Sequence, residues 1–307
     1  KAFSDAGYNV TYLQGYHSET DKTDKKLEDE ALSKISGKHP ILFIGGLPEH
    51  FESEGYDRAT LRLPENQISL INKITELRNN IIFVNISGSA VEIPFAEKVD
   101  AILHISLGGQ AVDSALVKLI TGKVNPSGKL SETFPCKLVD TPCCKYFGTD
   151  CDIEYRESIF VGYRFYSTYK KPVSFCFGHG LSYTSFTYFD ASVIQEGMCT
   201  SNINPKSSQK PTVRFHIKNN GLIFGKEVCQ IYIKNPEGNF MRPEIELAGF
   251  KKISLEGGEE KAVEIPLTEN AFKIWDKNRK AFTTVRGNMK FLSVQVPKIC
   301  DLLYGLM

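Results

Sequence analysis

Hydrophobic and polar residues in the first 135 positions follow two alternating periods. Four short apolar runs are typical of strands: YNVTYL (8–13), HPILFIG (39–45), NIIFVNIS (80–87) and DAILHISLG (100–108). Three segments carry apolar residues at helical spacing: 23–35, 64–78 and 110–122. This alternation indicates a mostly parallel sheet covered by helices on both faces. We therefore predict an α/β domain, an αβα sandwich, over residues 1–135.

The pattern changes twice after that domain. Residues 136–185 are rich in aromatics and glycine without a sustained period, so we expect this connecting segment to pack against another surface. From residue 186 apolar residues alternate with polar ones, with turn signals at Asn220-Gly221 and Gly257-Gly258. We predict an all-β immunoglobulin or fibronectin III-like sandwich over 186–307. The tail from Phe291 fits this alternation poorly, and we assign it no element.

Four carboxylates crowd the loop that leaves the second apolar run. Glu49, Glu52, Glu54 and Asp57 all lie within GLPEHFESEGYDR, residues 46–58. Ligands of open parallel sheets bind at the carboxyl ends of the strands, which is where this loop begins. A solvated loop with local ion pairs would explain the acids. Alternatively, like charges and partial burial would raise a glutamate pKa from about 4.3 toward 6, as a general acid requires.

Composition and charge exclude several other functions. The net charge is +1 and charged residues make up 24% of the chain, which does not suggest a partner that is a nucleic acid or a membrane surface. No apolar run approaches the roughly 18 residues of a membrane span. GKVNPSGKL (122–130) has one residue too many between its glycines for a phosphate loop, and Leu130 replaces the Ser or Thr that would bind magnesium. Dinucleotide, nucleophile-elbow and metal-ligand patterns are also absent from the sequence.

The eight cysteines leave the compartment open. Four of them, Cys136, Cys143, Cys144 and Cys151, form a C-x6-C-C-x6-C pattern that is not a usual zinc spacing, so we favour thiols. The chain begins at Lys1 and runs directly into patterned sequence. We interpret it as a fragment whose N-terminal part is missing.

Several blocks together resemble a known family. They are FESEGYDR, LPENQISLI, SGSAVEIPF, GGQAVDSALVKLITGKVNPSGKLSETFP, YRESIFVGYRFYSTYKKPVSFCFGHGLSYTSF and KNNGLIFGKEVCQIYIK with RPEIELAGFKKISLEGGE. In this order they are similar to the C-terminal half of a glycoside hydrolase family 3 β-glucosidase, over roughly residues 5 to 290. The resemblance implies that an N-terminal (β/α)8 barrel, which carries the nucleophilic aspartate, and the opening strand of the sandwich are absent from this chain.

The resemblance also implies roles for the acidic loop. The family's general acid/base position best matches Glu52, with Glu54 as the alternative, and Asp57 with Arg58 would structure the loop by an ion pair. Tyr155 and Arg156 would contact the barrel. The partners implied are the barrel and a β-glucoside or oligosaccharide substrate, with no cofactor and no metal.

The whole protein is then expected to hydrolyse terminal β-D-glucosyl residues with retention, and this chain alone to be inactive. A retaining mechanism requires the carboxyl groups of the nucleophile and of the acid/base to lie about 5 to 5.5 Å apart. The sandwich would therefore have to dock firmly on the barrel. Two alternatives stay open at this stage. One is a non-catalytic carbohydrate-binding or assembly module, and the other is a family 3 enzyme for another sugar, such as a β-xyloside.

Overall fold

Segments rich in branched and aromatic residues in the first half of the chain form a three-stranded parallel sheet, ordered β1-β2-β3. This computed structural model describes residues 1–35, 39–77, 80–148, 152–199, 209–234, 242–284 and 290–292. The strands are β1 (Ile41–Gly46), β2 (Ile81–Ile86) and β3 (Ala101–His104). The predicted parallel sheet is thereby confirmed, and its central strand β2 is buried on both faces, as a near-continuous apolar run requires.

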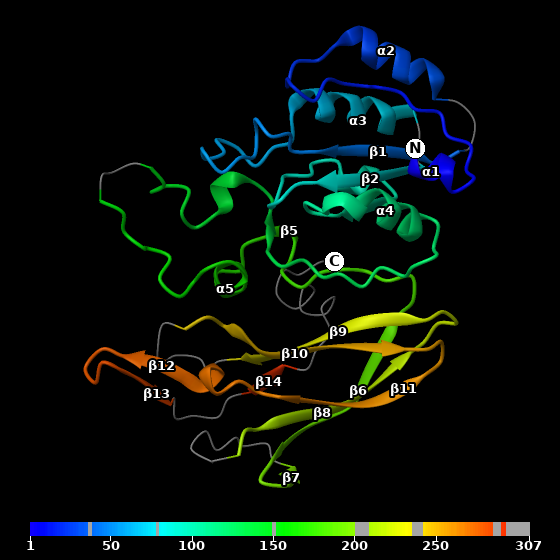
Figure 1. The fold of residues 1–307 in the computed structure, drawn as a ribbon. Coiled ribbons are helices and arrows are strands. Elements are labelled where there is room, and N and C mark those ends of the chain that lie inside the picture. The colour runs from blue at the N-terminus through cyan, green and yellow to red at the C-terminus, as the bar shows by residue number, and fades with distance from the viewer. Residues whose placement is uncertain are drawn as a thin grey trace. The chain divides into compact units, whose positions relative to one another are not determined.

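Helices cover both faces of this sheet (Figure 1). They are α1 (Ala2–Asp5), α2 (Lys25–Lys34), α3 (Glu65–Leu77) and α4 (Val112–Ile120), with α2 beside α3 and α1 beside α4. The apolar stripe of α3 is buried as its spacing predicts, with Ile71 completely inaccessible. The remaining short elements of this part are η1 (Ala96–Lys98), η2 (Gly109–Ala111), β4 (Phe134–Pro135) and η3 (Leu138–Asp140).

The prediction of a strand at residues 8–13 is wrong. This segment belongs to no strand or helix, and Tyr8, Val10 and Tyr12 are exposed. Alternation of apolar residues shows that a segment could pair, but a strand needs a neighbour to accept its backbone hydrogen bonds. No ladder among the described residues provides that neighbour.

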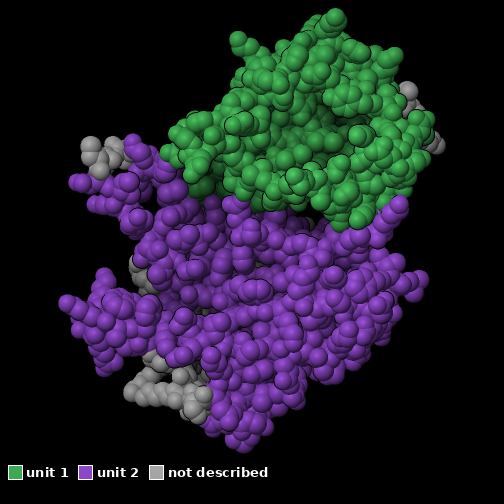
Figure 2. Space-filling view, in the orientation of Figure 1, with its two compact units in different colours: residues 1–121, 134–141 green, residues 122–133, 142–307 purple. Residues whose placement is uncertain are grey.

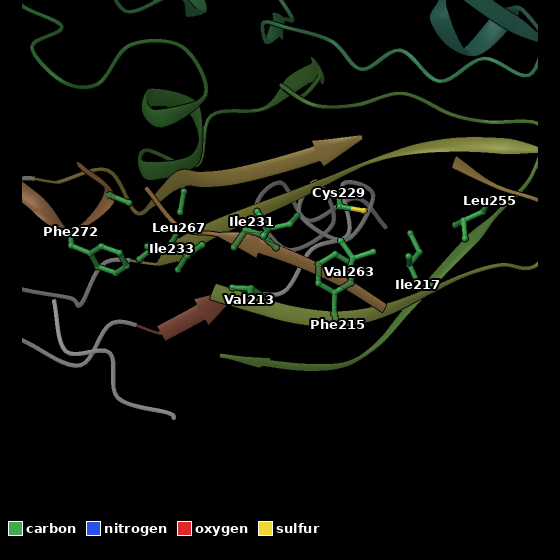
Figure 3. Close-up of a cluster of buried hydrophobic side chains, with 13 residues drawn as sticks. Val213, Phe215, Ile217, Cys229, Ile231, Ile233, Leu255, Val263, Leu267 and Phe272 are labelled. Atoms are coloured by element: carbon green, nitrogen blue, oxygen red, sulfur yellow. The ribbon is translucent and has the colours of Figure 1, made fainter. Parts of the chain in front are cut away.

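Two antiparallel sheets form the second part, as predicted. One sheet is ordered β11-β8-β6-β7 and the other β10-β9-β14. The strands are β6 (Phe186–Gln195), β7 (Met198–Cys199), β8 (Thr212–Asn219), β9 (Gly225–Lys234), β10 (Ile245–Leu255), β11 (Glu260–Pro266) and β14 (Lys290–Leu292), with η4 (Glu269–Phe272) and the hairpin β12 (Lys273–Asp276) and β13 (Ala281–Thr284) beside them. Inward residues of β8, β9, β10 and β11 build one apolar core, shown in Figure 3.

The part of the aromatic connecting segment around Tyr163 and Phe177 packs against the β9–β10 sheet, as expected for this segment. It contains α5 (Tyr163–Thr168) and β5 (Val173–Phe175). Tyr163 stacks on Phe177 at a centroid distance of 4.8 Å, and its hydroxyl accepts a hydrogen bond of 2.8 Å from the backbone N–H of Leu247. Tyr155, in contrast, is 92% exposed.

Contacts between residues divide the chain into two units, coloured separately in Figure 2. One comprises 1–121 with 134–141, and the other 122–133 with 142–307. The domain limits at 135 and 185 stay a prediction. Of the clustered cysteines, Cys136, Cys143 and Cys144 are free thiols, while Cys151 and the tail beyond Leu292 lie outside the described residues. No helix of the described residues is long and apolar enough to cross a bilayer.

The last residue of β1, Gly46, must be a glycine because the backbones of β1 and β2 approach closely there. Its φ is +148°, and a Cβ there would lie 1.9 Å from the carbonyl oxygen of Ile86. We expect Gly46→Ala to lower the free energy of unfolding by more than about 2 kcal/mol, because the two backbones must separate. Gly55→Ala is the control, since nothing lies within 4 Å of that Cβ. Urea unfolding of both variants measures the difference, and equal stabilities would contradict the prediction.

Candidate active site

The acidic loop starts where β1 ends, at the carboxyl edge of the parallel sheet (Figure 1). The side chain of Gln67, on α3, accepts from the N–H of Gly46 and donates to its carbonyl, both at 2.9 Å. Leu47 then donates to the carbonyl oxygen of Ile86, 2.9 Å away, at the end of β2. Because a buried amide and a neighbouring strand hold this exit, the loop leaves the sheet in a defined direction.

The loop folds back on itself in two turns. The N–H groups of Phe51 and Glu52 both donate to the carbonyl oxygen of Pro48, at 2.8 and 3.1 Å. The Tyr56 hydroxyl donates to the carbonyl oxygen of Glu49 at 2.6 Å, and Ser53 bridges to Tyr56. The tip between these two bridged residues therefore projects as a tight turn.

Both carboxylate oxygens of Glu52 accept hydrogen bonds from the loop that follows β2. The backbone N–H of Gly88 donates to Oε2 at 2.7 Å, and the Ser89 hydroxyl donates to Oε1 at 2.8 Å. The guanidinium of Arg58 donates to Ser89 Oγ at 2.8 Å and to the carbonyl oxygen of Ala90 at 3.2 Å. Glu52 and Arg58 thus hold the acidic loop to one short segment of the next strand's loop.

The other acids of the loop do not share this contact. Glu49, Glu54 and Asp57 are exposed, and among the described residues none of their side chains makes a hydrogen bond or ion pair. Glu54 lies at the tip beside Gly55, where the space around a Cβ is open. Arg58 contacts Ser89 and Ala90 in the loop after β2, and the loop-structuring roles expected for Asp57 and Arg58 stay predictions.

A polar network lies beneath the β2 loop, at the ends of two strands. The completely buried Asn85 of β2 places its Nδ2 3.0 Å from Ser87 Oγ and 3.0 Å from His104 Nδ1. His104, the last residue of β3, has Nε2 3.2 Å from Ser106 Oγ. Burial lowers the pKa of His104 below its ordinary value, and the negative charge of Glu52 opposes this shift.

Sequence patterns did not identify this network. Asn85 lies inside an apolar strand and His104 ends another, so a polar residue within each apolar run was the available signal. For Tyr155 and Arg156, the structure shows exposure of Tyr155 and an Arg156 side chain bound to Glu154. Within the described part of the chain, no three His, Cys, Asp or Glu side chains gather where they could hold a metal ion.

Known proteins match the chain over most of its length. Residues 2–183 match the model of the glycosyl hydrolase family 3 C-terminal domain, and 227–293 that of the fibronectin type III-like domain. Thermostable beta-glucosidase B of Acetivibrio thermocellus is 41% identical over 285 residues, which are 92% of this chain and 37% of that protein. The exo-alpha-(1->6)-L-arabinopyranosidase of Bifidobacterium breve is 34% identical over 89% of this chain and 35% of its own length.

A solved structure agrees with the fold. The crystal structure of the Bifidobacterium adolescentis GH3 beta-glucosidase superposes with a TM-score of 0.85 at 31% identity, over 95% of this chain and 44% of that one. This chain therefore spans less than half the length of each of these three proteins.

Proposed function

This chain belongs to glycosyl hydrolase family 3, and from that premise we propose that its protein is a retaining β-glucosidase to which the acidic loop supplies the general acid/base. Relatives that cover this chain are glycoside hydrolases, most of them named as beta-glucosidases. The structure supports this with the acidic loop itself, which is anchored at the carboxyl edge of the sheet. At its tip the loop carries the carboxylate of Glu54, which pairs with none of the described residues.

The proposed reaction needs two carboxylates on different parts of the protein. In this family an aspartate on the N-terminal barrel attacks the anomeric carbon, and the bond from that carbon to the leaving oxygen breaks. A carboxyl of the acidic loop gives its proton to the departing oxygen, so that the aglycone leaves as an alcohol. The resulting carboxylate then takes a proton from water, whose oxygen attacks the glycosyl-enzyme and releases glucose.

The two hydrogen bonds that hold the Glu52 carboxylate change which glutamate we prefer as the general acid/base. Each oxygen of Glu52 already accepts a hydrogen bond from its own unit, at 2.7 and 2.8 Å, so this side chain serves to hold the loop. Glu54 is exposed at the open tip, where its carboxyl can reach a substrate that another domain binds. We therefore place the proton donor at Glu54 and a positioning role at Glu52, which is the reverse of the sequence-based preference.

One observation favours a different sugar. The arabinopyranosidase relative shows that a chain 34% identical to this one over 276 residues is found in a protein named for another glycone. The sugar would be chosen mainly by barrel loops outside this chain, so the acid/base assignment does not depend on it. The ratio of kcat/KM for aryl β-glucoside, β-xyloside and α-L-arabinopyranoside separates these candidates.

The stereochemistry of the first product tests the proposed function. We expect the complete gene product to hydrolyse an aryl β-glucoside and to release β-glucose first, because two displacements restore the starting configuration. Proton NMR of the anomeric signals within the first minutes measures this. The chain 1–307 alone is the control and should give no turnover. Release of the α-anomer first, or no hydrolysis of any of the three glycosides by the complete protein, would overturn the proposal.

A further inference from the structure

The network beneath the acidic loop connects the end of β3 to the carboxylate that holds the loop. We propose that His104 is a positioning residue for the acidic loop, acting on Glu52 through Asn85, Ser87 and Ser89. The consequence for catalysis rests on the proposed function, whereas the connection itself stands on the geometry of this unit.

The contacts of Asn85 determine which nitrogen of His104 carries the proton. The Asn85 amide nitrogen can only donate, and it lies 3.0 Å from His104 Nδ1, so this ring nitrogen must be the acceptor. In the neutral ring the proton then sits on Nε2, which donates to Ser106 Oγ at 3.2 Å. Burial lowers the pKa of His104, which favours this neutral form.

Two hydrogen bonds continue the connection from Asn85 to the backbone of Ser89, and a third joins the Ser89 side chain to Glu52. The second N–H of the Asn85 amide donates to Ser87 Oγ at 3.0 Å, and this leaves the Ser87 hydroxyl free to donate to the carbonyl oxygen of Ser89 at 2.9 Å. The Ser89 hydroxyl in turn donates to Glu52 Oε1 at 2.8 Å. An acceptor at His104 therefore sets the direction of the bonds as far as the carbonyl oxygen of Ser89. The direction of the last bond is set by the carboxylate of Glu52, which accepts, and His104 acts on it through the backbone position of Ser89.

A proton on Nδ1 is incompatible with this arrangement. Two donors, Nδ1–H and the Asn85 amide, would face each other over 3.0 Å. Turning the amide would bring in its Oδ1, which has no hydrogen-bond partner among the described residues. The Ser87 hydroxyl would then face an acceptor and turn toward it, and the carbonyl oxygen of Ser89 would lose its donor. Protonation of His104 thus loosens the segment on which Glu52 rests.

The neighbours of the His104 ring are few, and they connect it to Glu52 through Asn85. Its ring contacts Asn85 and Ser106, and it packs edge-on against Phe134 with centroids 5.2 Å apart. Among the described residues, the charged group that shifts its pKa is Glu52. Ser106, the exposed partner, adopts a positive φ of 47°, which costs energy in a residue other than glycine and marks a turn held by its surroundings.

Hydrogen exchange of the Gly88 amide tests the relay without reference to activity. In the complete gene product, we expect the protection of this amide, corrected for intrinsic exchange, to fall roughly three- to tenfold as pH drops through the titration of His104, the effect of losing about one hydrogen bond. His104→Asn keeps an acceptor opposite Asn85 and cannot be protonated, so its protection should stay high at both pH values. Ser106→Ala, outside the path to Glu52, should retain the step of the wild type.

Activity provides the second readout. If the relay positions the acid/base loop, the acidic limb of the kcat/KM profile should contain a step in the wild type that His104→Asn lacks. An exchange step that persists in His104→Asn, or equal protection of the wild type above and below the titration of His104, would overturn the proposal. If the protein hydrolyses no glycoside but shows the exchange step, the relay stands and the proposed function fails.

Discussion

Replacing Glu54 by alanine in the complete gene product should lower kcat/KM for glucosides with poor leaving groups about 10²- to 10⁴-fold, the usual contribution of a positioned general acid. An activated leaving group such as 2,4-dinitrophenolate departs without a proton, so its kcat/KM should change little. Added azide should restore turnover of the activated substrate and yield β-glucosyl azide, because azide attacks the glycosyl-enzyme without needing a base.

Glu52→Ala is the matched control, two residues away in the same loop. Its loss would free the Gly88 N–H and the Ser89 hydroxyl and loosen the loop, so both substrate classes should be affected alike and azide should not help. The opposite pattern, with leaving-group dependence and azide rescue at Glu52, would return the acid/base to that residue. Unchanged rates in both variants would remove the acidic loop from the mechanism.

Replacing Lys129 by methionine should lower the free energy of unfolding of the second unit by about 3 to 5 kcal/mol at neutral pH, because it leaves a buried carboxylate unpaired. Lys129 Nζ lies 3.1 Å from Glu227 Oε2, with only 11% and 8% of the two side chains exposed. Its ammonium also donates to the carbonyl oxygen of Gly180 at 2.6 Å. Tyr188 donates to the other oxygen of Glu227 at 3.3 Å.

The loss of unfolding free energy in Lys129→Met should depend on pH, with its largest value near neutral pH. Burial raises the pKa of Glu227, and Lys129 opposes that shift. A carboxyl with a raised pKa in the folded state contributes stability below its unfolded pKa, about 4.3, and loses it as pH rises through the folded value. Without Lys129 that pKa rises further, so the destabilisation should be largest near neutral pH and shrink as the pH falls toward the unfolded value.

The double variant Lys129→Met with Glu227→Gln separates the pair from the packing around it. It should recover most of the lost stability, since neither charge is left buried alone. Urea unfolding of the chain can be followed by the fluorescence of Trp275, which is the single tryptophan of the sequence and lies in this unit. A single variant as stable as the wild type, or a double variant no better than the single, would contradict the buried-charge argument.

The periodicity of the sequence was sufficient for the architecture. Near-continuous apolar runs placed β1, β2 and β3, stripes of period 3.6 placed α3 and α4, and alternation of period two indicated the sandwich strands. Each of these patterns reflects burial, which is a local property of the segment. The same reasoning failed at residues 8–13, where an apolar run lacks a strand to pair with. Whether a run pairs depends on residues that are distant in the chain.

The sequence by itself determined the two folds, the family and the loop that carries the acids. Tertiary structure alone decided which acid is tied down, because Glu52 meets its donors 36 and 37 residues further along the chain. It also brought His104 to Asn85 through the parallel pairing of β2 with β3. Periodicity specifies which face of a segment is buried, whereas the direction of a hydrogen bond depends on the partner that the neighbouring strand presents.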